Sequence, residues 1–468
     1  MLLRWLRRIL WGLLMITLCV FGLLSSYTLS KQRLFGLAQR QLQGPPAVHV
    51  AGRKLFTQAI PNVLSTPKTY HSNETESINS VLEPQRTNTI NCLKLFKGDK
   101  NETAKSKWLI KSKPFKPVPY QAFINTTKRC DLFRVARNYT EHVSDEEESF
   151  PLAFSIVIHK SVEQFERLLR ALYRPNNYYC VHVDRKASNA FHMAIKSLAD
   201  CFDNVFVAAK LEVVVYAGFT RLQADINCMQ ELRQNFSDWK YVLNLAGSEM
   251  PLKTNFEMVQ ILKLYNGTNL VGKNMRALNP WRWKNRYETV VTEGRGHIVK
   301  RDNSNTPPPY HLNITKGSAY AVLSRALIDY IFTDPVPLAF LEWSKSTYSP
   351  DEQFWATLNN VEHNPGLATP GGNPCPGTSY MQRAVLWYSP DCHGKNVRSV
   401  CVFGAGDLPW IIQRPEFVVN KFDLSVDYIA YQCVEELLRV RATHSAPWDI
   451  EHHKQYVDSH SGKSCPLS

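Results

Sequence analysis

Short apolar runs alternate with helical patterns between residues 154 and 265, and this alternation constrains the fold more than any other feature. Four runs have the length of buried strands: 154–159, 178–184, 204–208 and 241–246. Each is followed by apolar residues at helical spacing, at 162–172, 187–198, 222–232 and 255–265. Such alternation predicts an α/β fold with a mostly parallel central sheet and helices on both faces.

Polar residues follow three of the predicted strands. His159, Asp184 and the segment 246–249 fall at the carboxyl ends, where ligands bind in sheets of this class. The sequence contains no GxGxxG and no P-loop, which argues against a dinucleotide or Walker-type ATP site. Further along, 310–324 is expected to form a strand in which Gly317 closely approaches neighbouring backbone.

An uncharged segment, 9–27, follows an arginine-rich tip, 1–8. A helix of this length spans about 28 Å, close to the thickness of a bilayer core. The arginines favour a cytosolic tip, so the rest of the chain is expected in a lumen. A cleaved signal peptide ending near Ser25 and Ser26 is the alternative, although the apolar run is longer than is usual for one.

Sequons and cysteines agree with a lumenal location. Seven asparagines occupy glycosylation sequons: Asn73, Asn101, Asn125, Asn138, Asn235, Asn266 and Asn313. Ten of the eleven cysteines lie beyond the apolar segment, and none has CxxC or zinc-finger spacing. Disulfides are therefore the expected state, although spacing alone does not assign the pairs.

Charge and composition divide the rest of the chain. Residues 28–120 are polar and proline-containing and are expected to form a stem, 121–444 the folded domain, and 445–468 a polar, frayed tail. The net charge of +14 favours an anionic ligand, such as a nucleotide diphosphate or an acidic glycan. Nucleic acid is not expected, because no recognition helix or RNA-binding strand motif is present.

The segment 348–352, with the sequence YSPDE, has two compatible interpretations. Ser349 as N-cap, Pro350 at the first helical position and Glu352 three residues after the cap would form a capping box. A carboxylate at a helix N-terminus is also stabilised as the anion, and Glu352 could therefore act as a base at neutral pH.

For the other candidate residues, a structural role explains the sequence as well as a ligand-binding role does. Arg398 and Lys421 could together bind a pyrophosphate, although each alone is an ordinary surface charge. Asp184 could bind a nucleoside or cap the helix expected from 187. Position 186 is Lys, so the Asp-x-Asp motif that holds a metal ion in many sugar transferases is missing, and no metal is expected. Three tryptophans could stack on sugars or pack in the core: Trp281, Trp283 and Trp387.

Several of these motifs are together similar to one family. They are FPLAFS (150–155), YYCVHVDRKA (178–187), CFDNVF (201–206), RLQADINCM (221–229), GSAY (317–320), TYSPDE (347–352), VRSVCVFGAGDL (397–408) and NKFD (420–423). In order and spacing they resemble the core-2/I-branching β-1,6-N-acetylglucosaminyltransferases, glycosyltransferase family 14, across about 92–444. The resemblance implies a type II Golgi membrane enzyme with a GT-A fold. It also implies transfer of N-acetylglucosamine from UDP-GlcNAc to a sugar 6-hydroxyl, with inversion and without a metal or other cofactor.

The resemblance assigns roles to individual residues. Glu352 matches the catalytic base. Five residues match donor contacts: Val157, Asp184, Tyr216, Arg398 and Lys421. Three match acceptor contacts: Arg282, Trp387 and Tyr388. The implied disulfides are Cys92–Cys433, Cys130–Cys201, Cys180–Cys228 and Cys392–Cys401, and Cys375 and Cys465 are left without an implied partner. The expected partners are UDP-GlcNAc, an acceptor glycan or glycoprotein and the membrane, and a homodimer is an open alternative.

Three departures from the family pattern affect the acceptor and the activity. Glu249 stands where the family usually has Asp, and Val271 and Asn279 stand where core-2 enzymes use a glutamate and a lysine. An O-glycan acceptor of the core-2 type is expected. The alternatives are a weakly active or inactive glycan-binding scaffold and a related transferase, such as a peptide xylosyltransferase.

Overall fold

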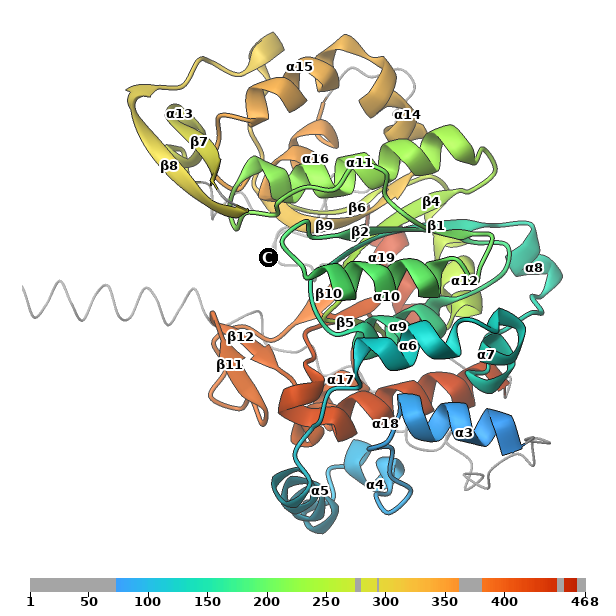
Figure 1. Cartoon of the computed structure of the whole chain (residues 1–468). Coiled ribbons are helices and arrows are strands. Elements are labelled where there is room, and N and C mark those ends of the chain that lie inside the picture. Colours follow the sequence, from blue (N-terminus) through green and yellow to red (C-terminus); the bar gives the residue numbers. More distant parts are fainter. Residues whose placement is uncertain (1–72, 274–278, 293, 362–380, 444–449, 461–468) are drawn as a thin grey trace, which may run out of the picture. The chain divides into compact units, whose positions relative to one another are not determined.

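The computed structural model describes residues 73–273, 279–292, 294–361, 381–443 and 450–460 (Figure 1). All of them belong to the unit Leu55–Ser468. The predicted membrane segment 9–27 lies outside the described residues. Among the helices that are described, none is both long enough and apolar enough to cross a bilayer.

The central sheet has the strand order β3-β2-β1-β4-β9-β6 (Figure 1). Its strands are β1 (Leu152–Ile158), β2 (Tyr178–Val183), β3 (Val205–Val207), β4 (Tyr241–Ala246), β6 (Leu270–Lys273) and β9 (Gly317–Ser324). The first four run parallel, and β9 is antiparallel to both β4 and β6. The predicted parallel strands are therefore confirmed, and an antiparallel pair extends the sheet beyond them.

Helices cover both faces of the sheet, as predicted. They are α9 (Val162–Leu172), α10 (Asn189–Ala199), α11 (Phe219–Asn235) and α12 (Asn255–Tyr265). Phe154, Ile156 and Ile158 of β1 share a core with α9, α10 and α12, whereas Ala153 faces the core that contains α11. This division follows from the period-2 alternation of side chains along a strand, and Figure 1 shows α11 on the opposite side of the sheet from α9 and α10.

The remaining elements lie on both sides of the central sheet (Figure 1). The helical segments are α13 (Trp281–Lys284), η3 (Pro309–His311), α14 (Arg325–Thr333), α15 (Pro335–Ser344), η4 (Pro350–Glu352), α16 (Phe354–Leu358), η5 (Ala405–Asp407), α17 (Leu408–Ile411) and α18 (Leu424–Thr443). A small sheet joins β5 (Glu249–Pro251), β13 (Val418–Asn420) and β10 (Arg383–Val385). Two hairpins complete the fold, β7 (Asn285–Thr292) with β8 (Arg295–Ser304) and β11 (Lys395–Val397) with β12 (Val400–Val402).

The prediction that the whole of 28–120 is a stem was wrong for its second half. Residues 73–148 form short helices: α3 (Asn73–Leu82), α4 (Cys92–Phe96), α5 (Lys100–Ser112), α6 (Tyr120–Thr126), α7 (Cys130–Ala136) and α8 (Asp145–Glu148). Leu82 and Leu95 are fully buried in the cores, and in Figure 1 α3 to α5 lie beside α18. The folded domain therefore begins no later than residue 73.

Buried ion pairs attach this N-terminal segment to the sheet domain. Glu83 follows α3 and contacts Arg137 (2.5 Å) and Arg170 (2.6 Å). Arg137 also contacts Glu166 (2.7 Å), and its side chain is almost completely buried. Burial alone would raise the pKa of Glu83, but the surrounding arginines outweigh it and hold that pKa well below the ordinary value. The segment is thus held by charge as well as by apolar packing.

Four disulfides join cysteines of the described residues, and they are the pairs that the family resemblance implies. They are Cys92–Cys433, Cys130–Cys201, Cys180–Cys228 and Cys392–Cys401. Cys375 and Cys465 lie outside the described residues. Six sequon asparagines have exposed side chains, as attachment of a glycan requires: Asn101, Asn125, Asn138, Asn235, Asn266 and Asn313.

The expectation of a frayed tail at 445–468 was also wrong in part. Residues 451–460 form a helix, α19 (Glu451–His460). His453 is fully buried, and its Nε2 lies 3.0 Å from the carbonyl oxygen of Pro415. Burial lowers the pKa of this imidazole to about 3, so the ring is neutral and packs against Tyr265 and Phe417.

We expect Arg137→Met to lower the free energy of unfolding by about 3–5 kcal/mol, because it removes a buried counter-charge of both Glu83 and Glu166. Urea unfolding of the detergent-solubilised full chain measures this difference. Lys196→Met is the matched control, since it removes the exposed pair with Asp200 (2.7 Å) and should change stability far less. Equal losses in the two variants would contradict a structural role for the buried network.

Candidate active site

A tight turn, not a capped helix, presents Glu352. Ser349 has a left-handed backbone (φ 46°) and makes no side-chain capping bond, so the predicted capping box is absent. The turn is fixed by backbone hydrogen bonds instead. The N–H of Ser349 donates to the carbonyl of Ala217 (2.7 Å), and the N–H of Tyr348 donates to the carbonyl of Arg282 (2.8 Å). The side chain of Glu352 therefore takes no part in a capping box, and it faces neighbouring side chains.

Two cations contact the carboxylate of Glu352. Arg282 Nη1 lies 2.5 Å from Oε2, and Lys316 Nζ lies 2.8 Å from the same oxygen. Burial would raise the pKa of Glu352, but Lys316 and Arg282 outweigh it, so that the pKa lies below the ordinary value. The group is therefore ionised at neutral pH and able to accept a proton.

Lys316 was not identified from the sequence. It directly precedes Gly317, whose predicted close approach is confirmed. A Cβ at that glycine would lie 2.4 Å from the carbonyl oxygen of Gly272 and 2.6 Å from the Cβ of Ala356. This packing brings the start of β9 against η4 and α16, and so brings Lys316 to Glu352. Gly317 was the sequence feature from which Lys316 could have been found. A glycine that packs closely against another element also brings the residues beside it in the sequence close to that element.

Asp351, beside Glu352, has a different environment. Its side chain is buried and the oxygen Oδ1 has no hydrogen-bond partner among the described residues. Burial raises the pKa of Asp351 to about 6, with a contribution from Glu352 and against the attraction of Arg221. Arg221 is itself paired with Asp225 (2.6 Å). Asp351 thus belongs to the interior under the turn.

The candidate phosphate-binding cations lie together on the other side of the site. Arg398 occupies the turn between β11 and β12, where it and Ser399 have positive φ values of 51° and 67°. Lys421 follows β13, and its Nζ donates to the carbonyl of Val397 (3.3 Å), the residue before Arg398. Burial, Arg398 and Lys160 lower the pKa of Lys421, which indicates a local excess of positive charge. The predicted proximity of the two cations is confirmed.

Residues 212–218, called here the linking loop, connect the cation pair Arg398 and Lys421 to the turn that carries Glu352. The ring of Tyr216 is exposed and lies under the guanidinium of Arg398, 5.1 Å from ring centroid to Cζ. The next residue is Ala217, which accepts the hydrogen bond from Ser349 in the turn of Glu352. One short backbone segment therefore fixes the cation pair and the carboxylate relative to each other.

Asp184 anchors the start of this loop. It follows β2 and accepts hydrogen bonds from the backbone of Lys186 (3.0 Å) and Val214 (3.3 Å), while Lys186 Nζ lies 2.8 Å from its other oxygen. Ser188, not Asp184, caps the following helix, which removes the capping alternative. Val157 is largely buried near the end of β1, in register with His182 of β2.

The predicted acceptor residues fall into two places. Arg282 lies in α13 with its guanidinium near the rings of Trp281 and Tyr348 (5.7 and 5.8 Å). Trp387 and Tyr388 lie instead along β12, through a bridge from Trp387 to Val400 and a backbone bond from Tyr388 to Ser399. Both of these side chains are exposed. Within the described residues, no hydrogen bond, ion pair or ring contact joins Trp387 or Tyr388 to Arg282.

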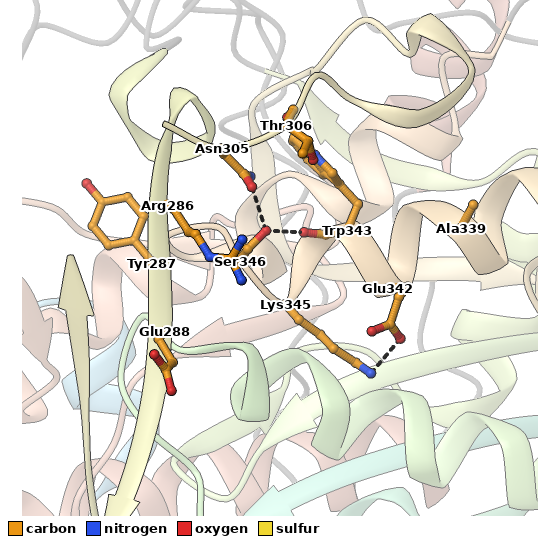
Figure 2. A pocket seen from close by; sticks show the side chains of 10 residues that line it. All are labelled: Arg286, Tyr287, Glu288, Asn305, Thr306, Ala339, Glu342, Trp343, Lys345 and Ser346. Carbon is orange, nitrogen blue, oxygen red and sulfur yellow. Dashed lines mark hydrogen bonds and ion pairs between the residues drawn. The ribbon is translucent and has the colours of Figure 1, made fainter. Parts of the chain in front are cut away.

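A cavity of about 630 Å³ lies next to the aromatic residues near Arg282 (Figure 2). Tyr287 lines it, and the same ring contacts Trp281 and Tyr348 at centroid distances of 6.4 and 5.4 Å. Figure 2 shows Arg286 reaching toward Ser346 and a Lys345–Glu342 pair (2.5 Å) at another wall. The cavity contains none of the residues predicted from the sequence to form the site.

The departures at 249 and 271 have structural explanations. Glu249 is completely buried, pairs with Arg383 and accepts hydrogen bonds from Asn420 (2.7 Å) and the backbone of Ala246 (2.9 Å). It therefore joins β4, β5 and β13 beneath Lys421 and does not face a ligand. Val271 is buried in the core on β6, so it cannot contact an acceptor.

One grouping of potential metal ligands occurs among the described residues: Cys392, Cys401 and Asp407. Its two cysteines form a disulfide and so provide no thiolate. Independence from metal ions remains a prediction.

The sequence profile of the Core-2/I-Branching enzyme family matches residues 152–412. A human protein named beta-1,3-galactosyl-O-glycosyl-glycoprotein beta-1,6-N-acetylglucosaminyltransferase is 41% identical over 370 residues, which cover 75% of this chain and 86% of the relative. A second human protein, with the same name and the suffix 3, is 40% identical over 76% of this chain and 84% of its own length. A bovine herpesvirus 4 protein (strain LVR140) with the same name as the first human protein is 40% identical over 76% of this chain and 83% of its own length. The chain belongs to the Core-2/I-Branching enzyme family.

Proposed function

We propose that this protein is a β-1,6-N-acetylglucosaminyltransferase that transfers N-acetylglucosamine from UDP-GlcNAc to the 6-hydroxyl of an acceptor glycan, with inversion and without a metal ion. The observation that carries the proposal is the ionised Glu352, joined through the linking loop to the cations Arg398 and Lys421. The names of the relatives support a β-1,3-galactosylated O-glycan as acceptor, which is branching of the core-2 type.

The chemistry would be a single in-line displacement. Glu352 takes the proton of the acceptor hydroxyl while that oxygen forms the new bond to the anomeric carbon. The bond from the anomeric carbon to the diphosphate breaks in the same step, and the released electron pair stays on UDP. Arg398 and Lys421 stabilise this growing negative charge, which is the electrostatic role that a divalent ion plays in other transferases.

The proposed location is the Golgi lumen, in a type II membrane orientation. The uncharged segment 9–27 with its preceding arginines supports this location, as do the exposed sequon asparagines and the four disulfides. Disulfides persist in the secretory compartments and are rare in the cytosol. An acceptor glycoprotein would reach the site from the same lumen.

Glu352→Gln should retain UDP binding and lose about 10²–10⁴-fold in transfer rate, because the amide cannot accept the proton. The assay gives UDP-GlcNAc and an array of glycans, including the core-1 disaccharide, to the detergent-solubilised full chain, and detects products by mass spectrometry. Glu146→Gln is the control, since that exposed residue pairs with Lys263 and lies outside the site. Full turnover by E352Q would refute the proposed base, and no product from any acceptor would favour a glycan-binding scaffold.

Arg398→Met and Lys421→Met should each weaken UDP binding and lower kcat, since both cations contact a leaving group that gains charge in the transition state. We expect losses of roughly 10²-fold in kcat/KM, with little change for the exposed-lysine control K196M. Kinetics at varied UDP-GlcNAc concentration, with UDP inhibition constants, separate the two effects. Wild-type kinetics in both variants would exclude the cation pair as the diphosphate site.

Transfer should continue undiminished in excess EDTA, because fixed side-chain cations take the place of a divalent ion. The measurement compares initial rates of the wild-type chain with EDTA, with added Mn²⁺ and with neither. R398M and K421M are tested in parallel, to detect whether Mn²⁺ restores part of their lost activity. A strict requirement for Mn²⁺ in the wild-type chain is the result that would overturn metal independence.

A further inference from the structure

The two carboxylate oxygens of Glu352 have unequal surroundings. Both Arg282 Nη1 and Lys316 Nζ contact Oε2. Arg282 lies in α13, and Lys316 directly precedes β9. Within the described part of the chain, no hydrogen bond reaches Oε1. A carboxylate held by two donors on one oxygen cannot rotate freely, so its other oxygen keeps a fixed direction.

Lys316 is itself firmly placed. Its side chain is largely buried, and its Nζ also donates to the carbonyl of Gly317 (2.8 Å). A side chain at Gly317 would clash with Gly272 and Ala356, so the backbone packs closely against both residues at this point. The ammonium group is therefore a fixed charge beside Glu352.

We propose that Lys316 is a positioning residue that, together with Arg282, holds Oε2 of Glu352 so that Oε1 receives the proton of the acceptor hydroxyl. The inference deepens the proposed function and rests on it. It divides the carboxylate into an anchored oxygen and a reacting oxygen, and it assigns the anchoring partly to a residue with no role in the sequence analysis. Lys316 acts through Glu352 and need not contact the acceptor.

The charged groups around Glu352 come from several elements, whereas α16, which also packs against η4, carries none. Arg282 lies in α13, Lys316 precedes β9, and Arg221 and Asp225 of α11 lie under the turn beside Asp351. Tyr348 is the remaining titratable neighbour, with its pKa raised by burial and by nearby groups that include Glu352. Of these, Lys316 and Arg282 contact the carboxylate directly.

Lys316→Met should therefore change the pH dependence of the reaction. The pKa of Glu352 is lowered by its cations, so activity is lost as the pH falls through that value. Without Lys316 the pKa rises, and the acidic limb of the kcat profile moves to higher pH by about one unit or more. We expect kcat at neutral pH to fall by roughly 10- to 100-fold, because the reacting oxygen loses its fixed direction. The KM for UDP-GlcNAc should stay unchanged.

The experiment measures pH–rate profiles and thermal midpoints of the full chain for wild type, K316M, K316R, E352Q and the control K196M. Arg at position 316 preserves the charge and should restore the wild-type acidic limb. An acidic limb that does not shift in K316M would overturn the positioning role. If the thermal midpoint of K316M is lower as well, Lys316 has a merely structural role. If the acidic limb of K316M is unshifted but E352Q is inactive, the positioning role fails and the proposed function still stands. Wild-type turnover in E352Q would instead refute the proposed base, whatever K316M shows.

Discussion

The arrangement of the site depends on the backbone hydrogen bond between Ala217 and Ser349. It fastens the linking loop to the turn that carries Glu352. One residue earlier in the same loop, Tyr216 lies under Arg398. A side chain can change rotamer without cost to the fold, whereas a backbone bond at 2.7 Å between two tight segments fixes both chains. The separation between Glu352 and the cation pair is consequently a property of the scaffold. The proposed displacement, with attack on one side and departure on the other, requires such a fixed separation.

Positive charge is used differently on the two sides of this loop. On the side of Glu352, the charges of Arg282 and Lys316 are matched by its carboxylate. On the side of Arg398, the pKa of Lys421 is lowered by burial and by neighbouring cations, which means that like charges are held together against their repulsion. Such an arrangement lowers its free energy when an anion binds between the cations. Under the proposed function, the cation pair binds the diphosphate, and the ionised Glu352 faces the neutral acceptor hydroxyl.

The sequence predicted the parts of the structure that local patterns determine. The strands and helices between 154 and 265 follow from apolar periodicity, and Gly317 follows from the need for close backbone contact. The segment 73–120 was mistaken for a stem because its attachment depends on charges far apart in the chain, such as the pair of Glu83 with Arg137. Lys316 was missed for the same reason, since its partner lies on a different element. Arg398 and Lys421 were proposed as a pyrophosphate-binding pair, and the family resemblance supported that pairing, but no periodicity connects two separate turns.

The neighbouring carboxylates Asp351 and Glu352 show how environment, not residue type, assigns the base. Both belong to one short turn, and the sequence gives no physical reason to prefer either. Burial without a hydrogen-bond partner for Oδ1 raises the pKa of Asp351 to about 6, whereas two contacting cations lower that of Glu352. Two acids whose pKa values are pushed apart in this way take different roles. Glu352 stays ionised and partly accessible, so it can exchange a proton with a ligand. Asp351 can become neutral near pH 6 without leaving the interior, which relieves its repulsion with Glu352 and leaves the contacts of the base in place.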